Sequence, residues 1–226
     1  MCICSGGTCG ELVYITMRKS RKTIYLIRHG RTGFNALGKY MGCGIDEDLS
    51  PEGISQIEEK REGIRSVTAG SVVFTGPLLR ARNTAGLIYY DSSVTVEDTL
   101  TEIDFGDFEG KSAAELSEDP RYQQWIDSDG TLTFPNGESI DDFRARTMSS
   151  LHNIINRAGD AEKIAIVCHG GCIMAIMSGL CGGKYHDYLI PNLDGYALYV
   201  TVDDERISDI TYDRITDGSI AGSSDW

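Results

Sequence analysis

Two short apolar stretches of this sequence end in the same dipeptide, His-Gly, and this repetition constrains the fold more than any other feature. Residues 23–27 lead into Arg28-His29-Gly30, and residues 164–168 lead into His169-Gly170. A run of β-favouring apolar residues without polar alternation is typical of a strand that is buried on both faces, as in a parallel sheet. The sequence therefore predicts at least two buried strands that deliver a histidine at their carboxyl ends.

Further strand and helix patterns alternate along the chain. Ser50-Pro51 is typical of a helix start, because serine caps the first turn and proline suits the first helical position. Residues 140–154 carry an apolar face at helical spacing, and residues 171–181 are apolar nearly all round, which predicts a buried helix. Additional strands are expected at residues 71–75, 196–202 and 207–212. This alternation predicts an α/β fold: a three-layer αβα sandwich with a mostly parallel central sheet.

Length and composition agree with one domain. The chain has 226 residues, of which 41% are hydrophobic and 24% are charged, as in ordinary globular proteins. We assign residues 17–226 to a single α/β domain, with an insertion around residues 97–138, where the pattern is less regular. Met17 precedes a basic segment and the first strand, so we expect residues 1–16 to be an N-terminal tail outside the fold.

The charge balance limits the partners of the protein. Lys and Arg number 21 against 34 Asp and Glu, a net charge of −13, which disfavours nucleic acid and anionic membranes. No apolar run approaches the roughly 20 residues that cross a bilayer. The seven cysteines fit a reducing compartment, so we expect a cytoplasmic protein. A zinc site on Cys2, Cys4 and Cys9 is a minor alternative, because no histidine lies near them.

Basic and imidazole side chains are expected to meet at one edge of the sheet. Ligands of open α/β sheets bind beyond the carboxyl ends of the strands. Arg28, His29 and His169 follow two such ends directly, and Arg80 follows the third after a short turn. Guanidinium groups match phosphate oxygens in bidentate geometry, so these residues predict an anion site. A single histidine at a strand end is more often structural, but the repeated pattern favours function. His152 and His186 are expected at the surface.

Five stretches resemble the histidine phosphatase superfamily, in its phosphoglycerate-mutase-like branch, and they occur in the family's order. The first is Arg28-His29-Gly30-Arg31-Thr32 with Asn35. The others are residues 42–53, 74–81, 100–110 and 166–171. The resemblance implies that His29 attacks phosphorus and that Glu102 serves as acid and then base. It also implies that phosphate is bound by Arg28, Asn35, Arg80, His169 and Gly170, with no metal and no cofactor.

The sequence leaves several alternatives open. Asp104, Asp107 and Glu109 compete with Glu102 for the role of the acid. Phosphoglycerate mutases share the scaffold, but residues 103–105 contain no basic side chain to grip a carboxylate, and residues 135–146 are similar to small phosphatases, including α-ribazole phosphatase. We therefore expect a phosphatase for a phosphorylated small molecule. A phosphoglycerate mutase, a non-catalytic phosphoanion-binding protein and a metal site on the two histidines are the alternatives.

Some positions depart from the family's pattern. Gly76 stands where the family usually has serine, so one contact to phosphate is expected to be missing. Lys39, Met41 and Cys43 also replace more usual residues in the first loop. Cys43 near the pocket would make the enzyme sensitive to oxidation. Because of these departures, the sequence does not identify the alcohol part of the substrate, and it does not identify the oligomeric state.

Overall fold

A seven-stranded sheet forms the middle layer of the protein. The computed structural model describes residues 19–128, 130–203 and 206–221, and every structural statement below concerns these residues. The strand order is β3-β2-β4-β1-β5-β6-β7; pairing is parallel from β3 to β1 and antiparallel from β1 to β7. The strands are β1 Lys19–Arg28, β2 Val72–Thr75, β3 Val94–Val96, β4 Lys163–Cys168, β5 Gly195–Asp203, β6 Arg206–Thr216 and β7 Ser219–Ala221.

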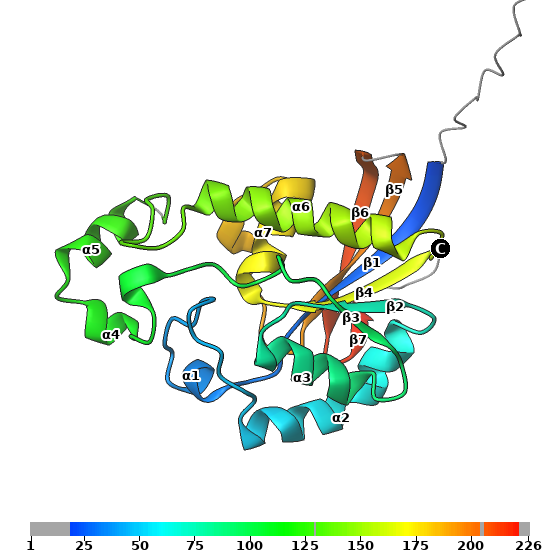
Figure 1. The fold of residues 1–226 in the computed structure, drawn as a ribbon, viewed down its shortest axis with the longest axis horizontal. Helices are drawn as coiled ribbons and strands as arrows, with labels where there is room; N and C mark the ends of the chain where they lie inside the picture. Colours follow the sequence, from blue (N-terminus) through cyan, green and yellow to red (C-terminus); the bar gives the residue numbers. More distant parts are fainter. Residues whose placement is uncertain (1–18, 129, 204–205, 222–226) are drawn as a thin grey trace, which may run out of the picture.

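Helices cover both faces of this sheet, which confirms the predicted three-layer α/β architecture. Helices α6 and α7 lie on one face, and α2 and α3 lie on the other (Figure 1). The α-helices are α1 Gly33–Ala36, α2 Pro51–Val67, α3 Leu79–Ile88, α4 Ala113–Leu116, α5 Pro120–Asp127, α6 Ile140–Ala158 and α7 Gly170–Cys181. Two 3-10 helices, η1 Gly106–Phe108 and η2 Tyr185–Tyr188, lie in the connections. In the described part of the chain, no helix has the length and apolar character needed to cross a membrane.

The central strands are buried on both faces, as their apolar runs predict. In β1, Ile24 and Leu26 pack into the core beneath α6 and α7, whereas Tyr25 and Ile27 pack into the core beneath α2 and α3. The side chains of strand β4 also alternate between the two cores, and this strand lies between β1 and β2. The three apolar runs thus form three adjacent parallel strands, and their carboxyl ends meet at one edge.

The helix starts follow the expected capping chemistry. Ser50 caps α2, where its hydroxyl accepts a hydrogen bond from the Gly53 N–H at 3.0 Å. Ser139 caps α6 in the same way through the Asp142 N–H at 3.0 Å. Helix α7 is buried from Gly170 to Met177, as its apolar composition predicts. Because α7 begins two residues after the end of β4, its first turn lies at the edge where β1 and β4 end.

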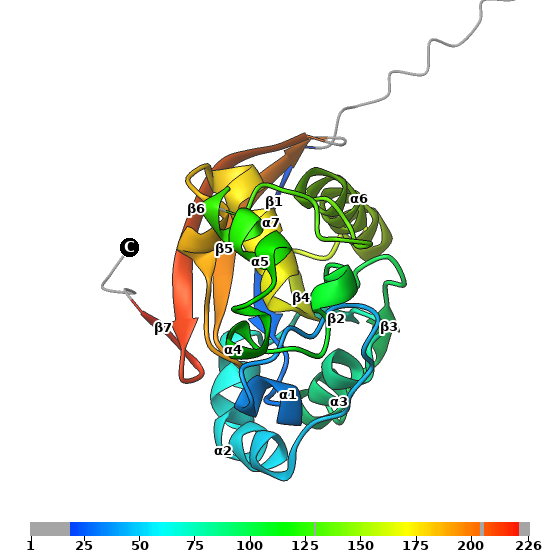
Figure 2. The same cartoon turned by 90° about the vertical axis from the view of Figure 1, so that its left-hand side faces the viewer.

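Residues 97–139 extend beyond the carboxyl ends of the parallel strands. This stretch contains η1, α4 and α5, and it lies with α1 at one end of the molecule (Figures 1 and 2). Its aromatic side chains meet largely edge to face: Phe105 packs on Phe134, and Phe108 packs on Tyr122 and Trp125. The stretch thus places an aromatic layer beside the strand ends. The tail expected at residues 1–16 lies outside the described residues.

Candidate active site

His29 lies at the end of β1 in a fixed tautomer. The backbone N–H of His29 donates to the carbonyl of Cys168 on β4 at 2.9 Å, and the residue is only 3% exposed. Nδ1 lies 2.7 Å from the carbonyl oxygen of Gly30, so Nδ1 carries the proton and Nε2 keeps a lone pair. Burial, followed by the charges of Arg28 and Arg80, holds the pKa of His29 well below its ordinary value of 6.5. The imidazole is therefore neutral and nucleophilic at physiological pH.

His169 lies beside His29 without a hydrogen-bond partner. It caps the N-terminus of α7, and the two imidazole centroids are 5.3 Å apart. The side chain is fully buried, yet neither ring nitrogen is hydrogen-bonded. Burial is the main reason that the pKa of His169 also lies well below 6.5. Buried polar groups are normally hydrogen-bonded, so the two unpaired ring nitrogens of His169 are an exception that a functional role would explain.

Two guanidinium groups flank the histidines. Arg80, in the first turn of α3, is fully buried, and its Nη atoms donate to the carbonyls of Ile45 at 2.8 Å and Gly42 at 3.0 Å. Arg28 donates to the carbonyl of Ile190 at 2.5 Å. The buried Nε of each arginine has no partner. These backbone contacts fix both cations and leave N–H groups for an anion.

Glu102 is the acid that the structure brings to the histidines. Its two carboxylate oxygens accept hydrogen bonds from the N–H groups of Gly171 and Ile103, both at 3.0 Å. A Cβ atom at position 171 would lie 2.1 Å from the Glu102 carboxylate, so only glycine permits this approach at the start of α7. Glu102 lines the same cavity as Arg28 and His29.

The three competing acids have other partners. Asp104 accepts from the Gly106 N–H at 2.8 Å, and Asp107 pairs with Arg121 at 2.6 Å on the surface. Glu109 accepts from the Gly44 N–H at 3.2 Å. Each carboxylate therefore organises its own loop, and none of the three lines the cavity that contains His29.

Asn35 lies at the cavity in α1, where a capping box with Thr32 holds it. Its side-chain oxygen accepts from the Thr32 N–H and from Asn192 Nδ2, both at 3.2 Å. Asn192 Nδ2 also donates to the carbonyl of His29 at 2.8 Å. Sequence analysis missed Asn192, which lies in the connection before β5 and carries no local signal. With its oxygen engaged, the Asn35 amide group is left to donate towards the cavity.

Thr84 is a second residue that sequence analysis missed. Its hydroxyl donates to the carbonyl of Arg80 at 2.6 Å, one helical turn earlier, and accepts from the Gly30 N–H at 2.9 Å. Its position four residues after Arg80 is the one signal that the sequence offered. Thr84 ties the turn after His29 to the helix that carries Arg80.

A cavity of about 300 Å³ is lined by Arg28, His29, Asn35 and Glu102, whereas the fully buried Arg80 and His169 do not line it. Gly170 and Gly171 line it at the start of α7, and its wall is mainly apolar and aromatic. The wall residues are Tyr40, Met41, Ile103, Phe105, Trp125, Phe134, Ile140, Met174, Tyr185 and Leu189. Lys39 also borders the cavity, but its ammonium group pairs with Glu115 at 3.4 Å. His186 is exposed, as expected, and borders the cavity as well.

The structure bears on two departures from the family pattern, at Gly76 and Cys43. A Cβ atom at position 76 would lie 2.4 Å from the carbonyl oxygen of Leu100, so a serine here would require the backbone to move. Cys43 does not line the cavity; its thiol groups with Asp104 and Glu109, and burial followed by these two acids raises its pKa. A raised thiol pKa lowers the thiolate fraction, so the expected oxidation sensitivity is not supported.

Sequence relatives of the chain include both phosphatases and mutases. It is 32% identical over 161 residues to the metal-independent phosphoserine phosphatase of Arabidopsis thaliana, covering 68% of this chain and 66% of that protein. It is 28% identical over 175 residues to a 2,3-bisphosphoglycerate-dependent phosphoglycerate mutase of Beijerinckia indica, covering 71% of this chain and 82% of the mutase.

Solved structures share the fold. The phosphoserine phosphatase of Entamoeba histolytica, solved with 3-phosphoglyceric acid, matches with a TM-score of 0.67 at 30% identity, over 78% of this chain and 90% of that one. The α-ribazole phosphatase of Shigella flexneri matches with a TM-score of 0.71 at 22% identity, over 89% and 100% respectively, and shows the fold alone. The family model of the histidine phosphatase superfamily (branch 1) matches residues 24–207. The chain belongs to the histidine phosphatase superfamily.

Proposed function

We propose that the protein is a metal-independent phosphatase that hydrolyses a phosphorylated small molecule through a phosphohistidine on His29. One observation carries this proposal: a neutral imidazole with a fixed tautomer lies beside the half-buried Arg28, the fully buried Arg80 and the unpaired His169. A phosphoryl group in the cavity would provide acceptors for these cations and an electrophile for Nε2. Phosphoryl transfer depends mainly on such positioning and electrostatic stabilisation.

In the first step, Nε2 of His29 attacks phosphorus and the bond to the leaving oxygen breaks. Glu102, in its protonated form, gives its proton to that oxygen, and the alcohol leaves. Arg28, Arg80 and His169 stabilise the charge on the phosphoryl oxygens. Asn35 and the Gly170 N–H, at the start of α7, would add neutral donors.

In the second step, the Glu102 carboxylate takes a proton from water. The water oxygen attacks phosphorus and the nitrogen–phosphorus bond breaks. Inorganic phosphate is released, and His29 returns to its neutral form. Glu102 is protonated again for the next cycle. One carboxyl group thus serves as acid and then as base, which matches its position beside His29 in the cavity.

The charges around the histidines argue against the alternative metal site. The positive charges of Arg28 and Arg80 act on both imidazoles, and a cation bound between them would be repelled. We therefore assign no metal to the reaction, and the two steps above use no cofactor. The net charge of −13 supports a small-molecule substrate rather than nucleic acid or membrane. The described cysteines are free thiols, which supports a cytoplasmic location.

The cavity wall favours hydrolysis over the mutase alternative. A mutase must grip the carboxylate of phosphoglycerate, whereas Lys39 on this wall is paired with Glu115. The complete set of charged residues and Glu102 argues against a protein that only binds phosphoanions.

The test is phosphate release from p-nitrophenyl phosphate in the presence of a chelator. We expect turnover by the wild type and a loss of at least about 10³-fold for His29→Ala, because the nucleophile is removed. His152→Ala, on the half-buried middle of α6, is the matched control and keeps activity. Loss of activity with the chelator, or retention of activity by His29→Ala, would contradict the proposal.

A further inference from the structure

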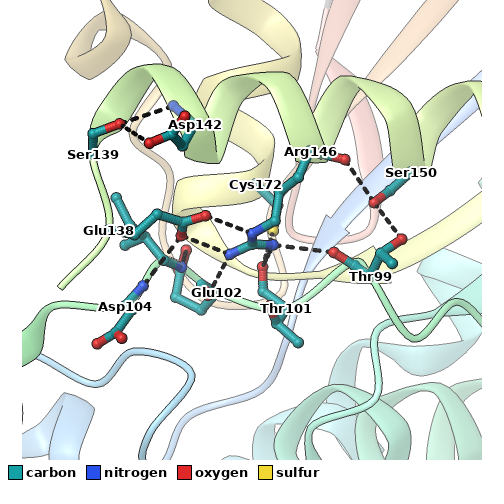
Figure 3. A network of polar contacts seen from close by, with 11 residues as sticks. Thr99, Thr101, Glu102, Asp104, Glu138, Ser139, Asp142, Arg146, Ser150 and Cys172 are labelled. Carbon is teal, nitrogen blue, oxygen red and sulfur yellow. Dashed lines mark hydrogen bonds and ion pairs between the residues drawn. The ribbon is translucent and has the colours of Figure 1, made fainter.

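One arginine outside the cavity lining uses all five of its donors, three of them on the segment that carries Glu102. Arg146 lies in the second turn of α6, and a guanidinium group has five N–H donors. Two of them bind the Glu138 carboxylate, at 2.8 Å and 2.9 Å. The other three bind backbone carbonyls of Thr99 and Thr101, both at 3.0 Å, and of Glu102, at 2.9 Å (Figure 3).

Glu138 holds the other side of the same segment. Its N–H donates to the carbonyl of Asp104 at 2.9 Å, and its Oε2 lies 3.4 Å from the Asp104 nitrogen. Residues 99–104 are therefore tied on both sides of Glu102 by the Arg146–Glu138 pair (Figure 3).

The geometry of this pair requires arginine. The planar guanidinium binds the carboxylate with two parallel hydrogen bonds and stacks over the Phe143 ring, 4.9 Å from its centroid. A lysine at this position has at most three donors on one atom and cannot form the same fork. The Arg146 and Glu138 side chains are 27% and 17% exposed, so solvent weakens the ion pair only in part.

We propose that Arg146 and Glu138 are positioning residues for Glu102, and that they set the efficiency of proton transfer to the leaving group. This inference rests on the role proposed for Glu102. Arg146 contacts the backbone of Glu102, and the Gly171 N–H contacts its carboxylate, so the acid is held at both ends. A displacement of about 1 Å is enough to cost a reaction about 100-fold.

The readout is the dependence of the first step on the leaving group. The rate at which the phenol or alcohol is released in a single turnover is measured with substituted phenyl phosphates and with an alkyl phosphate. The enzymes compared are the wild type, Glu102→Gln, Arg146→Lys and Glu138→Gln. A p-nitrophenolate leaves without a proton, whereas an alkoxide requires one. We expect Arg146→Lys and Glu138→Gln to slow alkyl phosphate cleavage about 10- to 100-fold, within the range of general acid catalysis, and p-nitrophenyl phosphate cleavage less than about 2-fold.

Arg157→Lys is the matched control. Arg157 also lies on α6, binds the Glu97 carboxylate at 2.9 Å and the Val96 carbonyl at 3.2 Å, and stacks on Phe74, but it does not contact Glu102. It should lose comparable thermal stability while keeping the wild-type dependence on the leaving group.

The outcomes separate the two proposals. The rate in Glu102→Gln could depend more steeply on the leaving group while both Arg146→Lys and Glu138→Gln keep the wild-type dependence. This result would overturn the positioning role alone. An equal loss on all substrates in these two variants would also overturn it, because that result indicates general distortion. If the wild type released no leaving group from any of these phosphates, the proposed function itself would be overturned.

Discussion

The floor and the wall of the cavity are built from different parts of the chain. The floor is the group formed by Arg28, His29, Arg80, Glu102 and His169 at the strand ends. Arg28, His29 and Glu102 line the cavity itself, and backbone contacts fix the side chains of Arg28, His29, Arg80 and Glu102. The wall consists of the aromatic and aliphatic side chains that surround the cavity, from the first loop, from residues 103–140 and from residues 174–189. The floor carries the charged groups and is buried apart from the half-buried Arg28, whereas the wall is mainly apolar.

This difference separates the reaction from the choice of substrate. Parallel strand ends meet at one edge, so the floor places its groups through the sheet itself. The wall depends on packing between helices and loops that are distant in sequence. We therefore expect floor substitutions to change the rate on every substrate, and wall substitutions to change the relative rates on different substrates.

The largest effect is expected when the floor loses its acid. Glu102→Gln keeps the size of the side chain but cannot transfer a proton, so turnover of an alkyl phosphate should fall about 10²- to 10⁴-fold. Steady-state kcat measures this loss. Asp107→Asn, an acid on the same stretch that pairs with Arg121 at the surface, is the control and should stay near wild type. Comparable losses in both variants would contradict the assignment of Glu102.

A smaller and selective effect is expected at the wall. Phe105 lines the cavity and packs between Tyr40 and Phe134, with ring centroids 5.2 Å and 5.0 Å away. Phe105→Ala should lower kcat/KM for an aryl phosphate about 10-fold, because aromatic contact is lost. Inhibition by inorganic phosphate, which reaches only the floor, should be unchanged. A weaker inhibition by phosphate would show that the wall and the floor are not separate.

The smallest effect is the pH dependence of stability that the floor imposes. His29 and His169 stay neutral in the folded protein, while in the unfolded chain they bind protons near pH 6.5. The unfolded state therefore binds more protons on acidification, and the free energy of unfolding falls. The expected loss between pH 7 and pH 6 is about 0.7 kcal/mol for each histidine. Denaturant unfolding measures the free energy of unfolding at each pH, and His169→Asn should lose about half as much of it between pH 7 and pH 6 as the wild type. The same loss in this variant as in the wild type would contradict the neutral burial of His169.

The floor could be predicted from the sequence because each of its side chains belongs to a local motif. His29 and His169 follow apolar runs, and Glu102 lies in a stretch that resembles the family. The supporting contacts could not be predicted in this way. Asn192 reaches His29 from 163 positions away, and Arg146 reaches the Glu102 carbonyl from 44 positions away. Such contacts depend on tertiary packing, which leaves no periodic pattern in the sequence.

The same reason explains what was missed in the sheet. Strands β3 and β7 have three residues each and lie at its two edges, so they are too short to show a periodic pattern. Strand β1 begins at Lys19, before its apolar run, because its first residues pair with the end of β5.

The location of the phosphoryl group during turnover distinguishes a phosphohistidine on His29 from every other route. Wild-type enzyme is mixed with p-nitrophenyl phosphate, quenched rapidly in alkali, digested and analysed by mass spectrometry. We expect one phosphoryl group on the peptide that contains His29, and none on that peptide in His29→Ala. A phosphoryl group on another residue, or turnover with a product burst and no phosphorylated His29, would contradict it.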